Sequence, residues 1–326
     1  MASVIGGGAD VSDVTDCRKA AMYIDDSCLS FEEDLSLRLR SLYQQSGYRR
    51  FTMGRFEEYD LYAQFRDFLT SESIISFTDT NGRLMALKPD VTLFFAANNK
   101  VAPGAVGRVY YNENVYRVSK NTGTFREIMQ VGVECLGAIT ADDVAQVLVL
   151  AAKSLDVVSG ANVLAITSLD ILSEALEALS PVAATREAAA RFMAERNVHE
   201  LEALCARAGV DEVAGKKAVA LLKAPRQWRA CVAELSRLGF APKAVAALAD
   251  AAQAVEKAGF GANLAMDFSL VNDTAYYNGL TFQGFVAGVP RAVLMGGQYD
   301  NLLTKLGRDQ RAVGFAVYMD GIRSAE

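Results

Sequence analysis

The stretch that decides the fold is IMQVGVEC, residues 128–135. In an extended strand, alternate side chains lie on opposite faces. The odd-numbered positions carry apolar or thiol side chains that can bury against a core. The even-numbered face presents Gln130 and Glu134 on either side of Gly132, which has no side chain. That face is predicted to leave a shallow gap for a small polar ligand with an ammonium or imidazole N–H. The alternative is a half-exposed strand with ordinary polar residues outward.

The composition is that of a globular protein. The chain has 326 residues, enough for one large domain or two ordinary ones, and 51% of them are apolar. A net charge of -6 argues against a protein whose main work is gripping a nucleic-acid backbone. A run of about 18 apolar residues is absent, and so are the basic start and apolar segment of a secretion signal. We therefore expect neither a nucleic-acid nor a membrane partner, and we expect residues 1–14 to be a disordered tail.

The cysteines and the single histidine argue against metal chemistry. The five cysteines are odd in number and never spaced as C-x-x-C, which favours reduced thiols and a cytoplasmic protein. They are Cys17, Cys28, Cys135, Cys205 and Cys231. His199 lies among helix-forming residues, so neither a metal site nor a histidine-based catalytic triad is expected. The residues suggest no cofactor.

The first half of the chain shows a helical pattern, a block of strand patterns and a second helical pattern. Residues 30–46 have a helical pattern that Ser30 and Glu33 can begin as a capping box and Gly47 can end. A second helix is predicted over residues 141–155, where apolar side chains recur at helical spacing. Strands are predicted at residues 48–52, 74–78, 84–87, 106–111, 114–118, 125–136 and 161–166.

The composition shifts after Ile166. Residues 168–259 are rich in Ala, Leu, Glu, Lys and Arg and predict a helical insertion of four or five amphipathic helices. Strands are then predicted at 264–271 and 279–287, which we expect to form a pair, and at 292–295 and 313–318. Strands and helices in separate blocks indicate an α+β fold, with one antiparallel sheet flanked by helices. We expect one core domain over residues 1–326.

Five motifs, in order, resemble the catalytic core of the histidyl-tRNA synthetase family, which has the class II aminoacyl-tRNA synthetase fold. The resemblance runs from about residue 15 to the C-terminus and is weak across the helical insertion. The motifs are FTDTNGRLMALKPDVT (77–92), VYR (115–117) leading into REIMQVGVE (126–134), YYNG (276–279), GGQYDNL (296–302) and AVGFA (312–316).

The resemblance implies a pocket for free histidine. Its residues would be Asp90, Thr92, Arg117, Gln130, Glu134, Tyr276 and Tyr277. Asp90 stands where the family usually has Glu, and either carboxylate suits the α-ammonium of an amino acid. Gln130 and Glu134 would meet the ammonium or the ring nitrogens through charge-assisted hydrogen bonds. Of the two tyrosines, one could pack in the core while only the other meets the ligand.

The same resemblance implies that the machinery for using ATP is lost. Arginines of the family are replaced by Thr124, Asn272 and Gly321, and Tyr318 replaces a glycine that lets ATP approach. Cations supply the charge stabilisation that adenylation needs, so we expect no efficient adenylation and no catalytic residues. The anticodon-binding domain that follows the last motif in the family is also expected to be missing.

A chain that retains the amino-acid pocket of the family but has lost its ATP-binding residues resembles the regulatory subunits of ATP phosphoribosyltransferase. This resemblance implies a chain that activates the short-form catalytic subunit at the first step of histidine biosynthesis and relays feedback by L-histidine. It also implies a hetero-octamer built on a synthetase-like homodimer. One alternative is a degenerate histidyl-tRNA synthetase-like enzyme that activates an amino acid or transfers it to an acceptor other than tRNA. It would need the missing ATP residues. Another is a regulator of a different partner or a structural scaffold, although a scaffold would have no need for the pocket acids.

Overall fold

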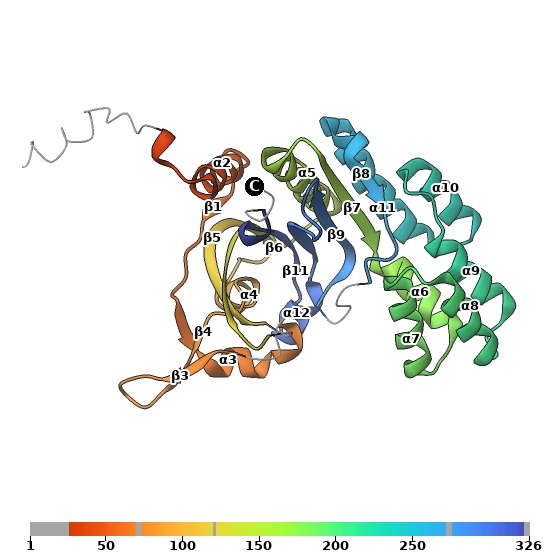
Figure 1. The fold of residues 1–326 in the computed structure, drawn as a ribbon, viewed down its shortest axis with the longest axis horizontal. Coiled ribbons are helices and arrows are strands. Elements are labelled where there is room, and N and C mark those ends of the chain that lie inside the picture. The colour runs from red at the N-terminus through yellow and green to blue at the C-terminus, as the bar shows by residue number, and fades with distance from the viewer. Residues whose placement is uncertain (1–25, 70–73, 120–121, 272–275, 323–326) are drawn as a thin grey trace, which may run out of the picture.

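A computed structural model describes residues 26–69, 74–119, 122–271 and 276–322. Its centre is an eight-stranded sheet (Figure 1). The strands lie in the order β1 (Arg49–Arg50), β5 (Val106–Val118), β6 (Phe125–Gly137), β11 (Arg311–Tyr318), β10 (Leu294–Gln298), β9 (Asn278–Val286), β7 (Asn162–Ser168) and β8 (Leu264–Met266). Only the two edge pairs, β1 with β5 and β7 with β8, are parallel. The expected α+β fold around a mostly antiparallel sheet is confirmed.

Two long helices cover one face of the sheet, α2 (Phe31–Gln45) and α5 (Ala141–Val158). Each begins with a capping box, formed by Ser30 with Glu33 in α2 and by Thr140 with Asp143 in α5. The odd-numbered side chains of β6, from Val131 to Cys135, are buried against these helices in the main apolar core. The prediction that the apolar face of this strand packs against a core is thus confirmed.

The other face of the sheet is concave and holds α4 (Thr92–Asn98), as Figure 1 shows. Around it lie α3 (Tyr59–Gln64), α12 (Asp300–Lys305) and a small sheet in the order β2 (Phe56–Glu58), β4 (Leu84–Leu87), β3 (Ser76–Thr78). Side chains from these elements form a second apolar cluster that includes Tyr62, Leu93, Tyr276 and Tyr299. The polar face of β6 looks into this concave side.

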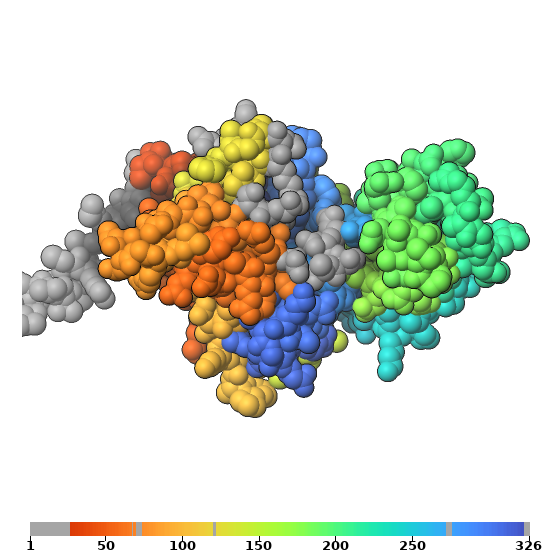
Figure 2. Space-filling model, turned by 90° about the horizontal axis from the view of Figure 1, so that it is seen from below, coloured from red at the N-terminus to blue at the C-terminus, as the bar shows by residue number. Residues whose placement is uncertain are grey.

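The helical insertion forms a lobe beside the sheet (Figures 1 and 2). Its six helices are α6 (Leu169–Leu179), α7 (Ala183–Ala194), α8 (Val198–Arg207), α9 (Glu212–Leu222), α10 (Trp228–Arg237) and α11 (Pro242–Val255). Our prediction of four or five helices was too low. The turn between α7 and α8 has no glycine or proline to signal it. Instead Arg196 adopts a left-handed φ of 54° and Asn197 caps α8.

Two strand predictions were wrong. The segments 106–111 and 114–118 form one continuous strand, β5. The polar run Asn112–Asn114 separates the two predicted strands, but its backbone pairs with β6 without a break, opposite Met129 to Val131. The segments 264–271 and 279–287 do not pair, because β7 lies between β8 and β9. A pairing between strands distant in sequence cannot be read from the local pattern of either one.

Two further expectations concern the N-terminal tail and membrane-spanning segments. The tail predicted at residues 1–14 lies outside the described residues. Within the described ranges, each helix is either too short or too polar to cross a lipid bilayer.

Candidate functional site

A cavity of about 440 Å³ opens on the concave face of the sheet. Its walls come from β5, β6, β9, β10 and β11 and from the segment that leads into α4. All seven residues that the sequence analysis assigned to a pocket line this cavity: Asp90, Thr92, Arg117, Gln130, Glu134, Tyr276 and Tyr277. The structure therefore brings together side chains that are scattered over most of the sequence.

The polar face of β6 forms part of the cavity wall. Gln130 and Glu134 are only 3% and 1% exposed, so the alternative of a half-exposed surface strand is wrong. The gap predicted above Gly132 is also not open. A Cβ at Gly132 would lie 2.6 Å from the Tyr111 ring, which occupies this space. The glycine makes room for an aromatic ring of the protein itself, and the ligand space lies beside that ring.

Glu134 has hydroxyl groups as its hydrogen-bond partners. Thr92 donates to Oε1 at 2.5 Å, and the Tyr299 hydroxyl donates to Oε2 at 2.6 Å. Gly314 leaves room for the carboxylate, since a Cβ there would lie 2.0 Å from Oε2. Burial raises the pKa of Glu134 to about 8, although both hydroxyl bonds act to lower it, and the nearby Asp90 raises it further. The carboxyl group is therefore held in a setting that favours its neutral form.

Asp90 lies at the start of α4, beside a cation. Its Oδ1 accepts a hydrogen bond from the Leu93 N–H at 2.7 Å, and its Oδ2 lies 3.9 Å from the Arg117 guanidinium. Arg117 also donates to the Pro89 carbonyl at 3.1 Å, which fixes its position. Burial raises the pKa of Asp90, while Arg117 and the backbone N–H groups oppose the rise. A carboxylate and a guanidinium side by side can meet the ammonium and carboxylate of an amino acid.

Aromatic rings close one side of the cavity. The Tyr276 ring packs edge-on to Tyr277 at 4.6 Å and lies 6.0 Å from Tyr299, both between ring centroids. Tyr276 belongs to the second apolar cluster, whereas Tyr277 is only half-buried. Both tyrosines nevertheless line the cavity, so packing in the core does not remove Tyr276 from the site.

Residues 27–322 match the histidyl-tRNA synthetase family. An ATP phosphoribosyltransferase regulatory subunit of Clostridium kluyveri is 30% identical over 299 residues, which cover 87% of this chain and 75% of that protein. The chain belongs to the histidyl-tRNA synthetase family and, within it, to the ATP phosphoribosyltransferase regulatory subunits. The protein of the same name from Clostridium acetobutylicum is 27% identical over 300 residues, which cover 88% of this chain and 73% of that protein.

Solved structures support the same fold. An ATP phosphoribosyltransferase regulatory subunit/histidyl-tRNA synthetase of Bacillus halodurans has a TM-score of 0.79 at 23% identity, covering 90% of this chain and 79% of that one. A chain of the ATP phosphoribosyl transferase (HisG:HisZ) complex from Thermotoga maritima has a TM-score of 0.72 at 18% identity, covering 89% and 98%. The synthetase-like sheet expected from the five motifs is thereby confirmed.

The sequence analysis missed several residues that line the cavity of this family member. Tyr299 is the most important, because it binds Glu134 directly. A signal for it was present, since Tyr299 follows Gly296 and Gly297 in one of the five motifs. Tyr111 gave no such signal, because only the fold places it over Gly132. The remaining lining residues without an earlier assignment include Phe68, Thr281, Gln283 and Met295.

Three of the positions where the resemblance implies a departure from the family are Tyr318, Gly321 and Asn272. Tyr318 lines the cavity, and burial raises the pKa of its phenol although Arg117 acts to lower it. Gly321 has the guanidinium of Arg291 only 3.3 Å from the place where its Cβ would be. Arg291 and Arg126 both bind Asp320, at 3.2 and 2.8 Å. Asn272, a third departure, lies outside the described residues.

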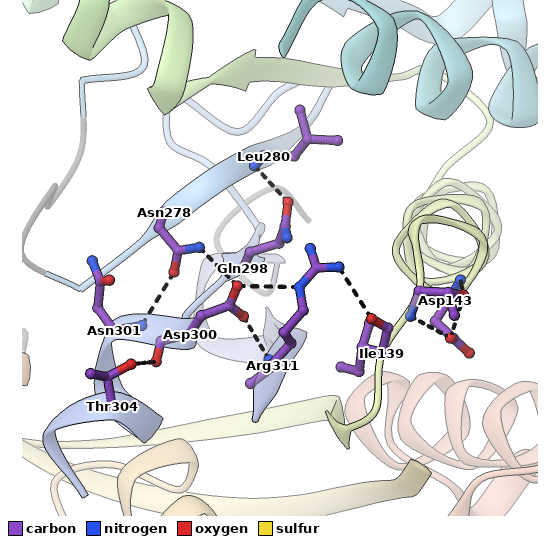
Figure 3. Close-up of polar contacts among 11 residues, drawn as sticks. Ile139, Asp143, Asn278, Leu280, Gln298, Asp300, Asn301, Thr304 and Arg311 are labelled. Carbon is purple, nitrogen blue, oxygen red and sulfur yellow. Dashed lines mark hydrogen bonds and ion pairs between the residues drawn. The ribbon is translucent and has the colours of Figure 1, made fainter. Parts of the chain in front are cut away.

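A polar cluster around Asp300 joins Asn278 to the segment that begins α12 (Figure 3). Asp300 accepts hydrogen bonds from the Ala312 N–H at 2.7 Å, from the Asn278 amide at 3.1 Å and from the Arg311 guanidinium at 3.4 Å. Asn278 directly follows Tyr277, and Asp300 directly follows Tyr299. The Asn278–Asp300 bond therefore fixes the starts of β9 and α12 relative to each other.

Gln298 has a structural role in the same region. The pairing of β9 with β10 shifts register between Gly297 and Gln298. The Gln298 amide oxygen accepts the Leu280 N–H at 2.9 Å, as Figure 3 shows. Gly279, with a φ of 61°, leaves room for this side chain, since a Cβ there would lie 2.5 Å from the amide oxygen. Gln298 thus satisfies a backbone donor at the irregularity and lies outside the cavity lining.

Proposed function

We propose that this chain is the non-catalytic regulatory subunit of an ATP phosphoribosyltransferase, and that its cavity takes free L-histidine as the feedback effector of histidine biosynthesis. The names of its relatives support the regulatory part of this proposal. The Thermotoga maritima structure is a HisG:HisZ complex, which supports an ATP phosphoribosyltransferase as the binding partner. By resemblance, this partner would be the short-form catalytic subunit. The observation that carries the histidine assignment is one cavity that holds Asp90, Arg117 and Glu134.

The cavity suits a zwitterion with a polar ring. Asp90 would bind the α-ammonium and Arg117 the α-carboxylate, because the two side chains lie 3.9 Å apart. The side chain of the ligand would then extend toward Glu134, between tyrosine rings that can pack against an imidazole. Gln130 adds an amide that can donate and accept hydrogen bonds on the same wall.

The chain would lack synthetase activity of its own. Tyr318 lines the cavity, and the resemblance implies that it replaces a glycine that lets ATP approach. Arg117 is the one cation among the described lining residues. We expect no histidine-dependent exchange of pyrophosphate into ATP above the background of a preparation free of synthetase. Exchange above that background would favour the alternative of a degenerate amino-acid-activating enzyme.

The proposal extends to assembly and place of action. By its family, the chain would form a homodimer within a hetero-octamer with the catalytic subunit, in the cytoplasm. A partner that forms a stable complex needs an extended contact patch, which for standard complexes totals about 1,600 Å². A histidine pocket that catalyses no reaction can still shift an equilibrium between two conformations of the complex. A coupling free energy of about 1–3 kcal/mol between this pocket and the catalytic site is enough for feedback.

A reconstitution experiment tests this function. The chain is mixed with a purified short-form ATP phosphoribosyltransferase, and size-exclusion elution and enzyme activity are measured with and without L-histidine. We expect co-elution as a large complex, activity that rises on mixing, and inhibition by histidine. Asp90→Ala should keep the complex but lose the histidine response. Asp79→Ala is the matched control, because Asp79 accepts its hydrogen bonds within an exposed turn. A catalytic subunit that is equally active and equally inhibited alone would contradict the proposal.

A further inference from the structure

Glu134 differs from every other acid that the structure buries in the described ranges. These acids are Asp90, Glu134, Asp143 and Asp267. Three of them have a guanidinium within ion-pair distance: Arg117 at 3.9 Å from Asp90, Arg108 at 2.5 Å from Asp143, and Arg196 beside Asp267. Glu134 has no lysine or arginine of the described chain within 4 Å. It is also the most deeply buried of the four.

None of the groups that face Glu134 can supply a positive charge. Those with a hydroxyl or acid are Asp90 and Thr92 at the start of α4, Tyr111 on β5, Tyr276 and Tyr277 before β9, and Tyr299 before α12. From β11 it faces Gly314, which carries no side chain. Arg117, the lining cation, is directed to Asp90 and Pro89. An ionised Glu134 would thus face another acid, Asp90, without a compensating cation from the described chain.

The two hydroxyl partners fit either protonation state of Glu134. The hydroxyls of Thr92 and Tyr299 can each donate or accept a hydrogen bond, so both suit a neutral carboxyl as well as a carboxylate. An ionised Glu134 therefore lacks a cationic partner among the described residues. Because Glu134 lines the cavity, a molecule bound in the cavity can supply that cation. If Asp90 and Arg117 bind the main-chain charges of an amino acid, the group that reaches Glu134 is the ligand's side chain.

We propose that Glu134 hands its proton to the ring of the bound ligand, so that the cavity selects an amino acid whose ring nitrogen is basic enough to accept it. The O–H bond of the carboxyl breaks, and an N–H bond forms on the ring. The carboxylate and the ring cation then form the ion pair that the empty site lacks, while Thr92 and Tyr299 donate to the carboxylate oxygens. This inference rests on the proposed histidine function and adds the protonation state in which histidine is held.

A definite pH dependence follows. A free imidazole ring titrates near pH 6.5, and Glu134 has a pKa of about 8. Between these values the ring enters neutral and Glu134 supplies the proton, so binding exchanges no proton with the solvent. Above pH 8 the complex must take up a proton, and below pH 6.5 it must release one. Histidine affinity should therefore be highest between the two values and fall by up to about tenfold per pH unit outside them.

Calorimetric titration tests the proposal. The parent and Glu134→Gln are titrated with L-histidine and with β-(1,2,4-triazol-3-yl)-L-alanine, whose ring has a similar shape but is much less basic. Each titration is run in two buffers of different ionisation enthalpy, at pH 7.2 and pH 9. The parent should prefer histidine by about tenfold or more, as for a charge-assisted hydrogen bond. At pH 7.2 the heat should not depend on the buffer, and at pH 9 it should report uptake of one proton.

The variants separate this inference from the function on which it rests. Glu134→Gln should lose the preference for histidine while its affinity for the triazole changes less than threefold, which also shows that the variant is folded. Glu127→Gln, on the same strand but outside the cavity, should behave as the parent. A kept preference in Glu134→Gln, or one proton exchanged at pH 7.2, would overturn the proton transfer alone. A parent that binds no histidine would overturn both proposals.

Discussion

The cavity and the cluster around Asp300 lie next to each other, but their acids, Glu134 and Asp300, have different kinds of hydrogen-bond partner. Asp300 receives donors from a backbone N–H, an amide and a guanidinium, all supplied by the chain itself. Glu134 receives two hydroxyls and no cation of the described chain. Buried polar groups are stable when their partners are complete, and costly when they are not. The cluster around Asp300 therefore stabilises the fold by itself, whereas we propose that a bound ligand completes the surroundings of Glu134.

The largest expected effect concerns stability against pH. Because the folded pKa of Glu134 is raised from 4.5 to about 8, the folded chain binds more protons than the unfolded one between these values. The parent should lose stability relative to Glu134→Gln as the pH rises through this range, by about 1.4 kcal/mol per unit of pKa displacement. Urea unfolding of both proteins at pH 5, 7 and 9 measures the difference. A constant difference across this range would contradict the comparison.

Asp143 provides a control of opposite sign for that experiment. Burial alone would raise the pKa of Asp143, but its bonds to Thr140 and Arg108 together lower it below 3.8. Its contribution to stability should be complete above the unfolded pKa and lost as the pH falls below about 4. Parent and Asp143→Asn should therefore differ by a constant amount between pH 5 and 9.

Arg117→Ala should give the next largest effect, on ligand binding. Loss of a charge-assisted contact costs about 1.5–3 kcal/mol, so histidine affinity should fall about 10- to 150-fold in calorimetric titration. Arg126→Ala is a matched control, since Arg126 lies opposite Arg117 in the β5–β6 register but binds Asp320. Equal losses in the two variants would mean that general charge, and not the site beside Asp90, attracts the ligand.

Asp300→Ala should affect the fold more than the ligand. The change leaves the Ala312 N–H without its acceptor and removes one of the two acceptors of the Arg311 guanidinium, which should cost about 1–3 kcal/mol of unfolding free energy. Histidine affinity of the folded variant should change less than in Arg117→Ala. Urea unfolding and calorimetry on the same preparation measure both quantities. An Asp300→Ala protein as stable as the parent would show that this cluster is not the stabilising one.

The smallest effect is expected for Arg291→Gln. Its ion pair with Asp320 lies at the surface, with the Arg291 side chain 47% exposed. Exposed pairs contribute about 0–1 kcal/mol, and salt screens them. The urea midpoint should move little at low ionic strength and not at all in 1 M salt. A larger shift would mean that this pair belongs with the structural cluster around Asp300.

Local patterns were sufficient to predict the elements and much of the site. Alternation along β6 placed Val131 and Val133 in the core, and the Ser30–Glu33 capping box located the start of α2. The motifs named seven residues that do line one cavity. These signals are short-range, because each depends on residues within one element.

What the sequence could not supply was the relation between distant elements. Tyr111 covers Gly132 because β5 lies beside β6, and nothing in either segment states which ring will fill the gap. The absence of a cation at Glu134 also depends on the directions of side chains from several segments. Strand partners and burial of charge are properties of the assembled fold, so β8 was given the wrong neighbour and Glu134 was taken as an ordinary ligand contact.

The position of β11 in the sheet determines at what stage of synthesis and folding the cavity can form. β6 pairs with β11 along its length, from Gly137 opposite Arg311 to Gln130 opposite Tyr318. During synthesis, Glu134 is made long before Tyr299 and Gly314, which complete its surroundings. Contacts across so many residues form late and slow the folding of a chain. The cavity therefore has no complete wall on the first half of a growing chain, and the ligand binding that we propose requires a molecule folded through β11.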